Sequence, residues 1–464
     1  MSLWENILNN LPEVAGPTQK RLSFKEKLKW TLIILVAFFI LGLVPLFGLG
    51  QNQLAQFDFL SLILGAEFGS LVSLGIGPIV TASIVLQLLI GSGILKLDLT
   101  KKEDKMRFQG LQKLAAIGFI ILEAAIYVLM GGLAPDPAVA GTVLFTQLQF
   151  MLIFQLFLGG ILILFMDEVI SKWGFGSGIS LFIAAGVSKS LFIRAFSWLP
   201  SPTQPGISTG AIPGFFQSLA AGDPITATLM IAAVISTIAV FVVAVYTQAM
   251  KVEIPLSFGR VRGYGIRWPL SFMYTSNIPV ILVAALMANM QLWARLFQNW
   301  GYPILGTYVG SSPSSGLVAW IQSPDIVGGL IKRSLTGLDV AHGAVYALFM
   351  VCGAVLFSWF WVQTAGMDAK SQARQIMASG LQIPGFRKDQ RVLERLLDRY
   401  IKPLTVMGAI AVGLLAAMAD LSGALAQGTG ILLTVMIIYR LYEEIAKQHM
   451  MDMHPMMRKF MSEK

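Results

Sequence analysis

The sequence predicts an all-α membrane protein with ten transmembrane helices. Of its 464 residues 55% are hydrophobic and 13% are charged, and its mean hydropathy is +0.71, whereas a soluble domain carries about 25% charged residues. The apolar residues form separate runs, most of them close to the roughly 20 residues that a helix needs to cross a ~30 Å hydrocarbon core. Loops rich in Gly, Pro, Ser or charged residues separate these runs, so the chain crosses the membrane many times.

The first 29 residues precede the first long apolar run. Trp4, Ile7, Leu8 and Leu11 recur at helical spacing with polar residues between them, and this pattern predicts a short amphipathic helix on the membrane surface. Basic residues follow it: Lys20, Arg21, Lys25, Lys27 and Lys29. We therefore expect residues 1–29 to form a cytosolic amphipathic helix and a basic segment.

Ten apolar runs are candidate spans. They lie at 30–49, 75–93, 110–130, 143–166, 178–196, 225–250, 269–292, 342–364, 403–419 and 429–446. A long external connection at 199–223, which is expected to act as a hinge, divides them into a first half at 30–198 and a second at 224–446. Because five crossings are an odd number, the second half starts on the opposite side of the membrane, so two pseudo-symmetric halves would be inverted. This symmetry follows from counting alone.

The basic residues predict which loops face the cytosol. Nearly all Lys and Arg lie in the termini and in four loops on one side, at 96–109, 167–177, 251–268 and 365–402. The opposite side has few: Lys189, Arg194, Arg295, Lys332 and Arg333. By the positive-inside rule both termini, including the C-terminal tail at 447–464, are cytosolic.

The segment before the second span, FDFLSLILGAEFGSL at 57–71, is apolar but too short to cross. Asp58 and Glu67 also make it a poor segment for contact with lipid. Gly69, Gly75, Gly77 and Pro78 join it to the second span. A half-helix joined in this way is re-entrant, and it is tolerated at membrane depth only where protein or water surrounds it. The sequence therefore indicates a cavity or pore inside the bundle.

Ile76 and Val80 lie four residues apart at the start of the second span, so they share one helix face. Their branched side chains suit the wall of a pore. Small and aliphatic residues also line ordinary contacts between membrane helices, and spacing alone favours this second interpretation.

Residues suited to enzyme chemistry are scarce. His342, His449 and His454 show no metal-ligand spacing. The run GFGSGIS at 174–180 resembles a phosphate-binding loop, but the chain has no Gly-Lys dipeptide, and the glycines better suit an abrupt start of a span after Trp173. We expect no enzyme activity, metal or cofactor.

Glu123, inside the third span, is the clearest ionisable residue within the membrane, while Asp420 at the end of the ninth span is ambiguous. Such residues are costly in lipid and usually functional. A secondary transporter of a small solute, built as an inverted repeat, would be expected to carry more of them. This transporter is the alternative function that the residues leave open.

Eight motifs together resemble the SecY family, the channel subunit of the Sec protein-translocation complex, and in particular its archaeal branch, which is homologous to the alpha subunit of the eukaryotic Sec translocon. The resemblance covers about 22–455. The motifs are LGIGPIVTASIVLQLLIGSGI (74–94), FQGLQKL (108–114), DEVISKWGFGSGISLFIAAGVS (167–188), KVEIPLSFGRVRG (251–263), SNIPVILVAALMANMQLW (276–293), GFRK (385–388), RYIKPLTVMG (399–408) and GTGILLTVMIIYRLYEE (428–444).

The resemblance implies a passive protein-conducting channel with an aliphatic ring at mid-membrane. The ring positions correspond to Ile76, Val80, Ile179, Ile183, Ile281 and Leu433. Branched apolar carbons disfavour a continuous column of water and bind no ion strongly. Residues of the half-helix would then form the plug of the closed channel: Phe59, Leu60, Leu62, Ile63, Leu64, Glu67 and Phe68.

The resemblance also implies a lateral gate between the second and seventh spans, flanked by the third and eighth. Its polar cluster corresponds to Thr81, Glu123 and Asn289. Through this gate hydrophobic segments would leave sideways into the bilayer. The alternative for these three residues is hydrogen bonding between helices, worth about 0.6 kcal/mol per contact.

Partners follow from the same resemblance. The ribosome, including its RNA, would dock on Arg260, Arg262, Arg387 and Lys388, although the positive-inside rule alone also explains basic residues there. A SecE-like (gamma) and a small beta-like single-span subunit would complete a heterotrimer in the plasma membrane. Signal peptides, nascent chains and lipids are the other expected partners, and a ribosome or another motor would drive transport.

Overall fold

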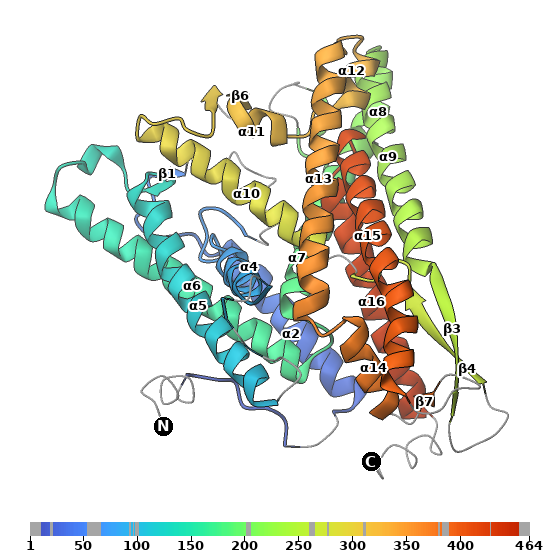
Figure 1. The fold of residues 1–464 in the computed structure, drawn as a ribbon. Helices are drawn as coiled ribbons and strands as arrows, with labels where there is room; N and C mark the ends of the chain where they lie inside the picture. The colour runs from blue at the N-terminus through green and yellow to red at the C-terminus, as the bar shows by residue number, and fades with distance from the viewer. Residues whose placement is uncertain are drawn as a thin grey trace.

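The computed structural model describes residues 11–18, 22–52, 66–91, 94–95, 97, 102–200, 206–258, 265–275, 278–309, 312–378, 381–382, 389–426 and 428–453. Long helices form a bundle with small sheets at its two ends (Figure 1). A helix overlaps each of the ten predicted spans. In the first half these are α2 (Phe24–Leu43), α4 (Gly77–Gly91), α5 (Lys102–Leu129), α6 (Val143–Trp173) and α7 (Gly178–Phe196). In the second half they are α9 (Pro224–Ala249), α10 (Ile278–Asn299), α13 (Gly337–Thr364), α15 (Gln390–Leu421) and α16 (Gly428–Met453).

Seven helices in the described part of the chain are long and apolar enough to cross a membrane by length and composition: α5, α6, α7, α9, α10, α13 and α15. Helix α4 is apolar but shorter. Helix α2 carries charged residues near its start, among them Lys27, and α16 carries them in its second half and at its middle, among them Arg440 and Glu444. The all-α membrane class predicted from composition is therefore confirmed.

The first span was predicted at 30–49, and both limits are wrong. Helix α2 begins at Phe24 because Ser23 and Glu26 form a capping box, in which the Ser23 hydroxyl accepts from the Glu26 N–H and the Glu26 carboxylate accepts from the Ser23 N–H. It ends at Leu43, since Val44 precedes Pro45 and takes an extended conformation.

The two basic loops at 251–268 and 365–402 join one three-stranded antiparallel sheet, with strand order β4-β3-β7. Strands β3 (Lys251–Phe258) and β4 (Gly265–Ser271) form a hairpin, and β7 (Leu381–Gln382) pairs with the end of β3. The predicted start of the seventh span at 269 is therefore wrong, because 265–271 is strand and α10 begins at Ile278. Helix α14 (Ala369–Ala378) packs on α15 beside this sheet.

The opposite end of the bundle also has regular structure. Helix α8 (Ala211–Ala220) lies within the hinge connection. The connection before α13 contains β5 (Thr307–Val309), β6 (Ser312–Ser315), α11 (Gly316–Ile321) and α12 (Ile326–Ile331). Strands β1 (Gln51–Asn52) and β2 (Leu133–Ala134) pair near the short helix η2 (Pro137–Val139).

The two halves share five helix–helix contacts, and the second half adds contacts of α10 with α15 and α16. In the first, α4 packs on α5, α5 on α6, α6 on both α2 and α7, and α2 on α7. In the second, α10 packs on α13, α13 on α15, α15 on both α9 and α16, and α9 on α16. When the helices of each half are numbered from one to five in chain order, these are the same five pairs. The sequence suggested this symmetry only through the number of its predicted spans.

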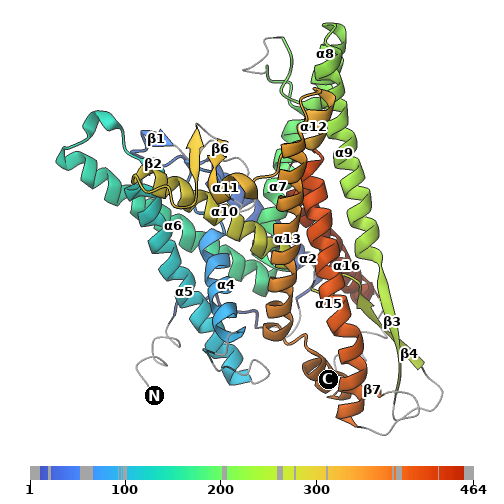
Figure 2. The same cartoon turned by 45° about the horizontal axis from the view of Figure 1, so that its top comes forward.

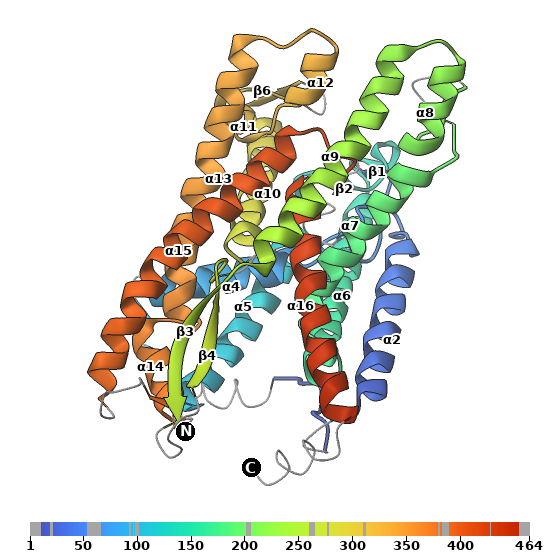
Figure 3. The same cartoon turned by 90° about the vertical axis from the view of Figure 1, so that its right-hand side faces the viewer.

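The halves meet along two lines. On one, α16 packs against α7 and α2, and Figure 3 shows α16 between α15 and α7. On the other, α4 packs against α10 and α13, and Figure 2 shows α10 above α4 with α13 beside it. The largest apolar core joins residues of both halves between these two lines.

Candidate pore and lateral gate

The six predicted ring residues come from four elements and lie in one apolar cluster. Five are buried, and Ile179 is partly buried and packs against the others. Ile76 and Val80 stand at the start of α4, Ile179 and Ile183 on α7, Ile281 on α10 and Leu433 on α16. Both halves therefore contribute to this cluster of hydrophobic side chains.

The backbone before α4 places Ile76 and Val80 one above the other. Gly75 has φ +55°, a left-handed conformation that favours glycine. The N–H of Val80 donates to the carbonyl oxygen of Ile76 at 3.0 Å. The two side chains are thus one helical turn apart on the same side of the segment.

The start of α7 is fixed by Asp167, which accepts the N–H of Ile179 at 2.9 Å. A Cβ at Gly178 would lie 2.6 Å from the Asp167 Cα, so this approach requires glycine. Helix α7 begins five residues after α6 ends at Trp173, which confirms the abrupt start predicted from GFGSG. The predicted cytosolic loop at 167–177 is largely helical, since α6 continues to Trp173.

The plug prediction falls partly outside the described residues, because Phe59, Leu60, Leu62, Ile63 and Leu64 are not among them. Phe68 packs against a second apolar cluster, which includes Tyr127 of α5 and Leu152 and Leu156 of α6. The Phe68 ring lies 6.5 Å from that of Tyr127. The Glu67 carboxylate forms an ion pair with Lys189 of α7. The end of the predicted plug is therefore in contact with two helices of the first half.

The segment at 66–76 is also hydrogen-bonded to the residues that follow α2. The Leu46 N–H donates to Gly69 O at 2.9 Å, and the Leu71 N–H donates to Val44 O at 3.0 Å. Gly159 on α6 lies so close that a Cβ there would overlap the Leu71 carbonyl oxygen. These backbone contacts fix the segment that carries Ile76.

At the predicted gate, the structure joins two of the three polar residues. The Thr81 hydroxyl on α4 donates to Gly77 O at 2.9 Å and lies 3.4 Å from Glu123 Oε1 on α5. Asn289 on α10 is half-buried, and the described residues show no hydrogen bond from it to either partner. The gate helices themselves, α4 with α10 and α13, are packed together.

Sequence reasoning left Asp420 ambiguous, and the structure shows it buried at the end of α15. It accepts the Tyr346 hydroxyl of α13 at 2.7 Å and the Thr429 N–H of α16 at 2.8 Å. Three helices of the second half therefore meet at one carboxylate. The position of an acid at the end of a span was the only signal in the sequence.

A second group that sequence reasoning missed joins residues 13–15 to the end of α6 and to Lys113 of α5. Lys172 forms an ion pair with Glu13 at 2.5 Å, and the Val14 N–H donates to Glu168 at 2.9 Å. Glu168 is also paired with Lys113 of α5. The Lys172 ammonium holds the pKa of Glu13 below its usual value, mainly through this hydrogen bond and charge.

The four predicted ribosome-docking residues, Arg260, Arg262, Arg387 and Lys388, lie outside the described residues. The structure does describe the neighbouring strands, in which Phe258 of β3 pairs with Leu381 of β7. In the described part of the chain, no group of three or more His, Cys, Asp or Glu could hold a metal ion.

Comparisons with known proteins extend over nearly the whole chain. A sequence model of the SecY family matches residues 70–442. The protein translocase subunit SecY of Methanothermobacter thermautotrophicus is 48% identical over 99% of this chain and 98% of the relative. That of Methanocaldococcus jannaschii is 42% identical over 98% of both.

Solved structures give the same result. A structure of a protein-conducting channel has a TM-score of 0.83 and 42% identity, covering 98% of this chain and 99% of that one. Sec61 from a canine ribosome–channel complex of the endoplasmic reticulum has a TM-score of 0.80 and 42% identity, with the same coverage. A SecY structure concerned with the plug domain and the closed state has a TM-score of 0.82 and 43% identity.

Two matched helical halves that close an aliphatic cluster between them, in a fold shared with these structures, define a membrane channel that conducts polypeptides. The chain belongs to the SecY family of protein translocase subunits. It is a multi-pass membrane protein and not an enzyme. The alternative of a small-solute transporter is thereby set aside.

Proposed function

We propose that this chain is the pore-forming subunit of its channel and that the structure represents the closed pore. The six aliphatic side chains form the constriction. The observation that carries this proposal is the single buried cluster to which α4, α7, α10 and α16 all contribute. A packed ring of branched carbons leaves no continuous water column, and it can deform around a passing chain.

The ring is tested by ion conductance of the reconstituted resting complex. Ile183→Asn combined with Ile281→Asn should raise conductance, because amide groups hold water in the constriction. The matched control is Ile183→Val with Ile281→Val, which keeps branched apolar carbons. If the Asn variant conducts no more than the Val variant, the ring is misassigned.

Residues 57–71 act as the plug in this proposal, and the contacts of Glu67 and Phe68 support it because they hold the end of this segment against α7 and α5. Thr81, Glu123 and Asn289 belong to the lateral gate. The packing of α4 against α10 and α13 supports the gate, since these contacts would separate when a hydrophobic segment leaves sideways.

The proposed topology places all ten helices across the plasma membrane in two inverted halves, with both termini cytosolic. The matching contact pairs support the halves. The start of α2, the end of α16, α14 and the sheet β4-β3-β7 lie at one end of the bundle (Figure 1), and this is the end with most basic residues.

The ribosome is the proposed cytosolic partner, docking on Arg260, Arg262, Arg387 and Lys388. Support comes from the Sec61 relative, which is 42% identical and was solved in a ribosome–channel complex, and from the sheet that joins the two loops. A SecE-like and a beta-like single-span subunit would pack on exposed apolar helix surfaces. Co-purification of two small single-span proteins with the chain tests this assembly.

A further inference from the structure

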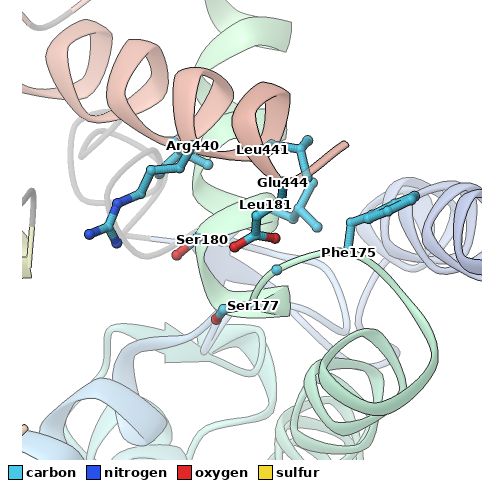
Figure 4. A pocket seen from close by; sticks show the side chains of 9 residues that line it. Phe175, Ser177, Ser180, Leu181, Arg440, Leu441 and Glu444 are labelled. Carbon is cyan, nitrogen blue, oxygen red and sulfur yellow. The ribbon is translucent and has the colours of Figure 1, made fainter. Parts of the chain in front are cut away.

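A cavity of about 330 Å³ opens between the start of α7 and the last turns of α16. Its wall on the α7 side is Phe175, Gly176, Ser177, Ser180 and Leu181, and its wall on the α16 side is Ile437, Arg440, Leu441 and Glu444. In Figure 4 the Glu444 carboxylate projects from α16 toward Ser177 and Ser180, the Arg440 guanidinium extends away to one side, and Phe175 lies on the other side. The size is at the lower limit of ligand sites, so it suits a side chain.

Glu444 is the acidic group of this cavity. It makes no hydrogen bond or ion pair with any described residue, whereas its neighbour Glu443 pairs with Lys251 at 2.9 Å. Gly176 has φ +69°, and even a Cβ there would stay 3.7 Å from Glu444 Oε2. The Glu444 side chain is exposed, so its carboxylate is accessible from the cavity.

The rest of the lining suits a cation. The Phe175 ring forms part of the wall and has Lys27 Nζ of α2 5.6 Å from its centroid, a distance at which an aromatic ring and an ammonium group attract each other. The Ser177 hydroxyl makes no cap hydrogen bond to α7, so its oxygen can accept. Arg440 lies one turn before Glu444 on α16 and forms no ion pair with it. The positive charge of Arg440 repels a cation that enters the cavity.

The cavity lies beside the path through the ring. Ser180 follows the ring residue Ile179 on α7, and Ile437 is one turn beyond Leu433 on α16. Glu444 is three turns beyond Leu433, roughly 16 Å along the helix. In the proposed topology, this side of the ring is the cytosolic entrance.

We propose that this cavity binds a Lys or Arg side chain of the entering polypeptide through Glu444, with Phe175 and Ser177 beside it. The inference rests on the proposed pore and topology. Glu444 is then a specificity-determining residue: a hydrophobic segment with a basic flank is held with that flank on the cytosolic side, and a neutral flank is not.

The test uses the reconstituted full complex and a reporter whose single hydrophobic segment has either a neutral or a Lys-containing flank. The ratio of cytosolic to translocated flank is measured. Glu444→Gln should reduce the effect of the Lys residues on this ratio by about two- to fivefold, the range for a partly exposed ion pair. Arg440→Gln should increase the effect, because it removes a repelling charge. Glu444→Asp should keep it.

Glu443→Gln is the matched control and should leave the Lys effect unchanged. A carbodiimide, which couples a carboxylate to an amine in contact with loss of water, should join the reporter's Lys to the wild-type chain but not to the Glu444→Gln variant. An unchanged Lys effect in Glu444→Gln, or the same loss in Glu443→Gln, would overturn the proposal.

The neutral-flank reporter measures the channel itself. If it crosses normally in every variant while the Lys effect is unaltered, the subsite is wrong and the pore stands. Should the ring variants fail to leak while the Lys effect follows Glu444, the pore assignment is wrong and the subsite stands. If Glu444→Gln does not assemble, Arg440→Gln tests the proposal, because it is expected to increase the Lys effect. A Lys effect that does not increase in Arg440→Gln would then overturn the proposal.

Discussion

Lys189 of α7 and Glu67, near the end of the proposed plug segment, form a long-range contact. The two residues are 122 positions apart in the chain. Both side chains are about one-third exposed, 37% for Lys189 and 36% for Glu67. Screening by water therefore limits the pair to about 0.2–1 kcal/mol, which is suited to a contact that must break when the channel opens.

Replacing Lys189 by Met should raise the resting conductance by up to about fivefold, because the closed state loses one ion pair of this strength. The double variant Lys189→Glu with Glu67→Lys should restore the parental conductance. Single-channel recording of the reconstituted complex measures both. A leak that the charge exchange fails to rescue would mean that Lys189 acts by another contact.

At the scale of elements, α6 and the plug segment meet backbone to backbone at Gly159. Any Cβ there overlaps the Leu71 carbonyl oxygen. Gly159→Ala should therefore displace the segment at 66–76, at a cost of about 1–3 kcal/mol for overpacking. The expected results are a lower midpoint of thermal unfolding in detergent and a higher resting conductance.

Gly118→Ala on α5 is the control for this prediction, since nothing lies within 4 Å of the Cβ it would add. It should match the parent in both measurements. Equal behaviour of the two Ala variants would show that α6 can move away from the plug segment at little cost.

The cytosolic sheet is the second element with a direct test. Strand pairing between Phe258 and Leu381 brings the two basic loops together, and guanidinium groups suit bidentate contacts to RNA phosphates. Arg260→Glu with Arg387→Glu should weaken ribosome binding and flatten its salt dependence. The reason is that binding through fewer phosphate contacts releases fewer counterions from the RNA.

Co-sedimentation with ribosomes across a salt series measures this effect, and protease mapping checks that topology is unchanged. Many other basic residues remain on the same side, so insertion should be normal. Binding equal to the parent at every salt concentration would leave these residues as topology signals only.

At the scale of the whole molecule, the two halves meet along the line where α4 packs against α10 and α13, which is the proposed lateral gate. Asn289 lies on α10 at this line without a hydrogen bond to Thr81 or Glu123 in the described residues. Asn289→Leu should favour the closed gate, because closure then buries an apolar side chain. The hydrophobicity needed for lateral insertion should rise by about one Leu, roughly 0.5 kcal/mol.

A series of test segments with increasing Leu content measures the midpoint of insertion. Leu286→Ile, on an exposed position of the same helix, is the control and should leave the midpoint in place. A midpoint that also stays in place for Asn289→Leu would reduce Asn289 to a packing residue.

Sequence alone predicted the membrane class, the order of ten helices and the family, because a bilayer demands long apolar runs and the motifs are specific. The sequence predicted the limits of the helices less accurately. The capping box at Ser23 and the strand at 265–271 moved two helix starts, since local hydrogen bonding and sheet pairing decide where an apolar run becomes helical.

Tertiary structure alone decided which residues meet. The predicted ring residues, from four elements of the chain, lie in one buried cluster, and Asp420 of α15 joins α13 through Tyr346 and α16 through Thr429. Spacing along one helix could not choose between pore and packing for Ile76 and Val80. The helix at whose start they stand, α4, packs against α10 and α13 of the other half as well as against α5, and only the packing of the two halves brings α10 and α13 into contact with it.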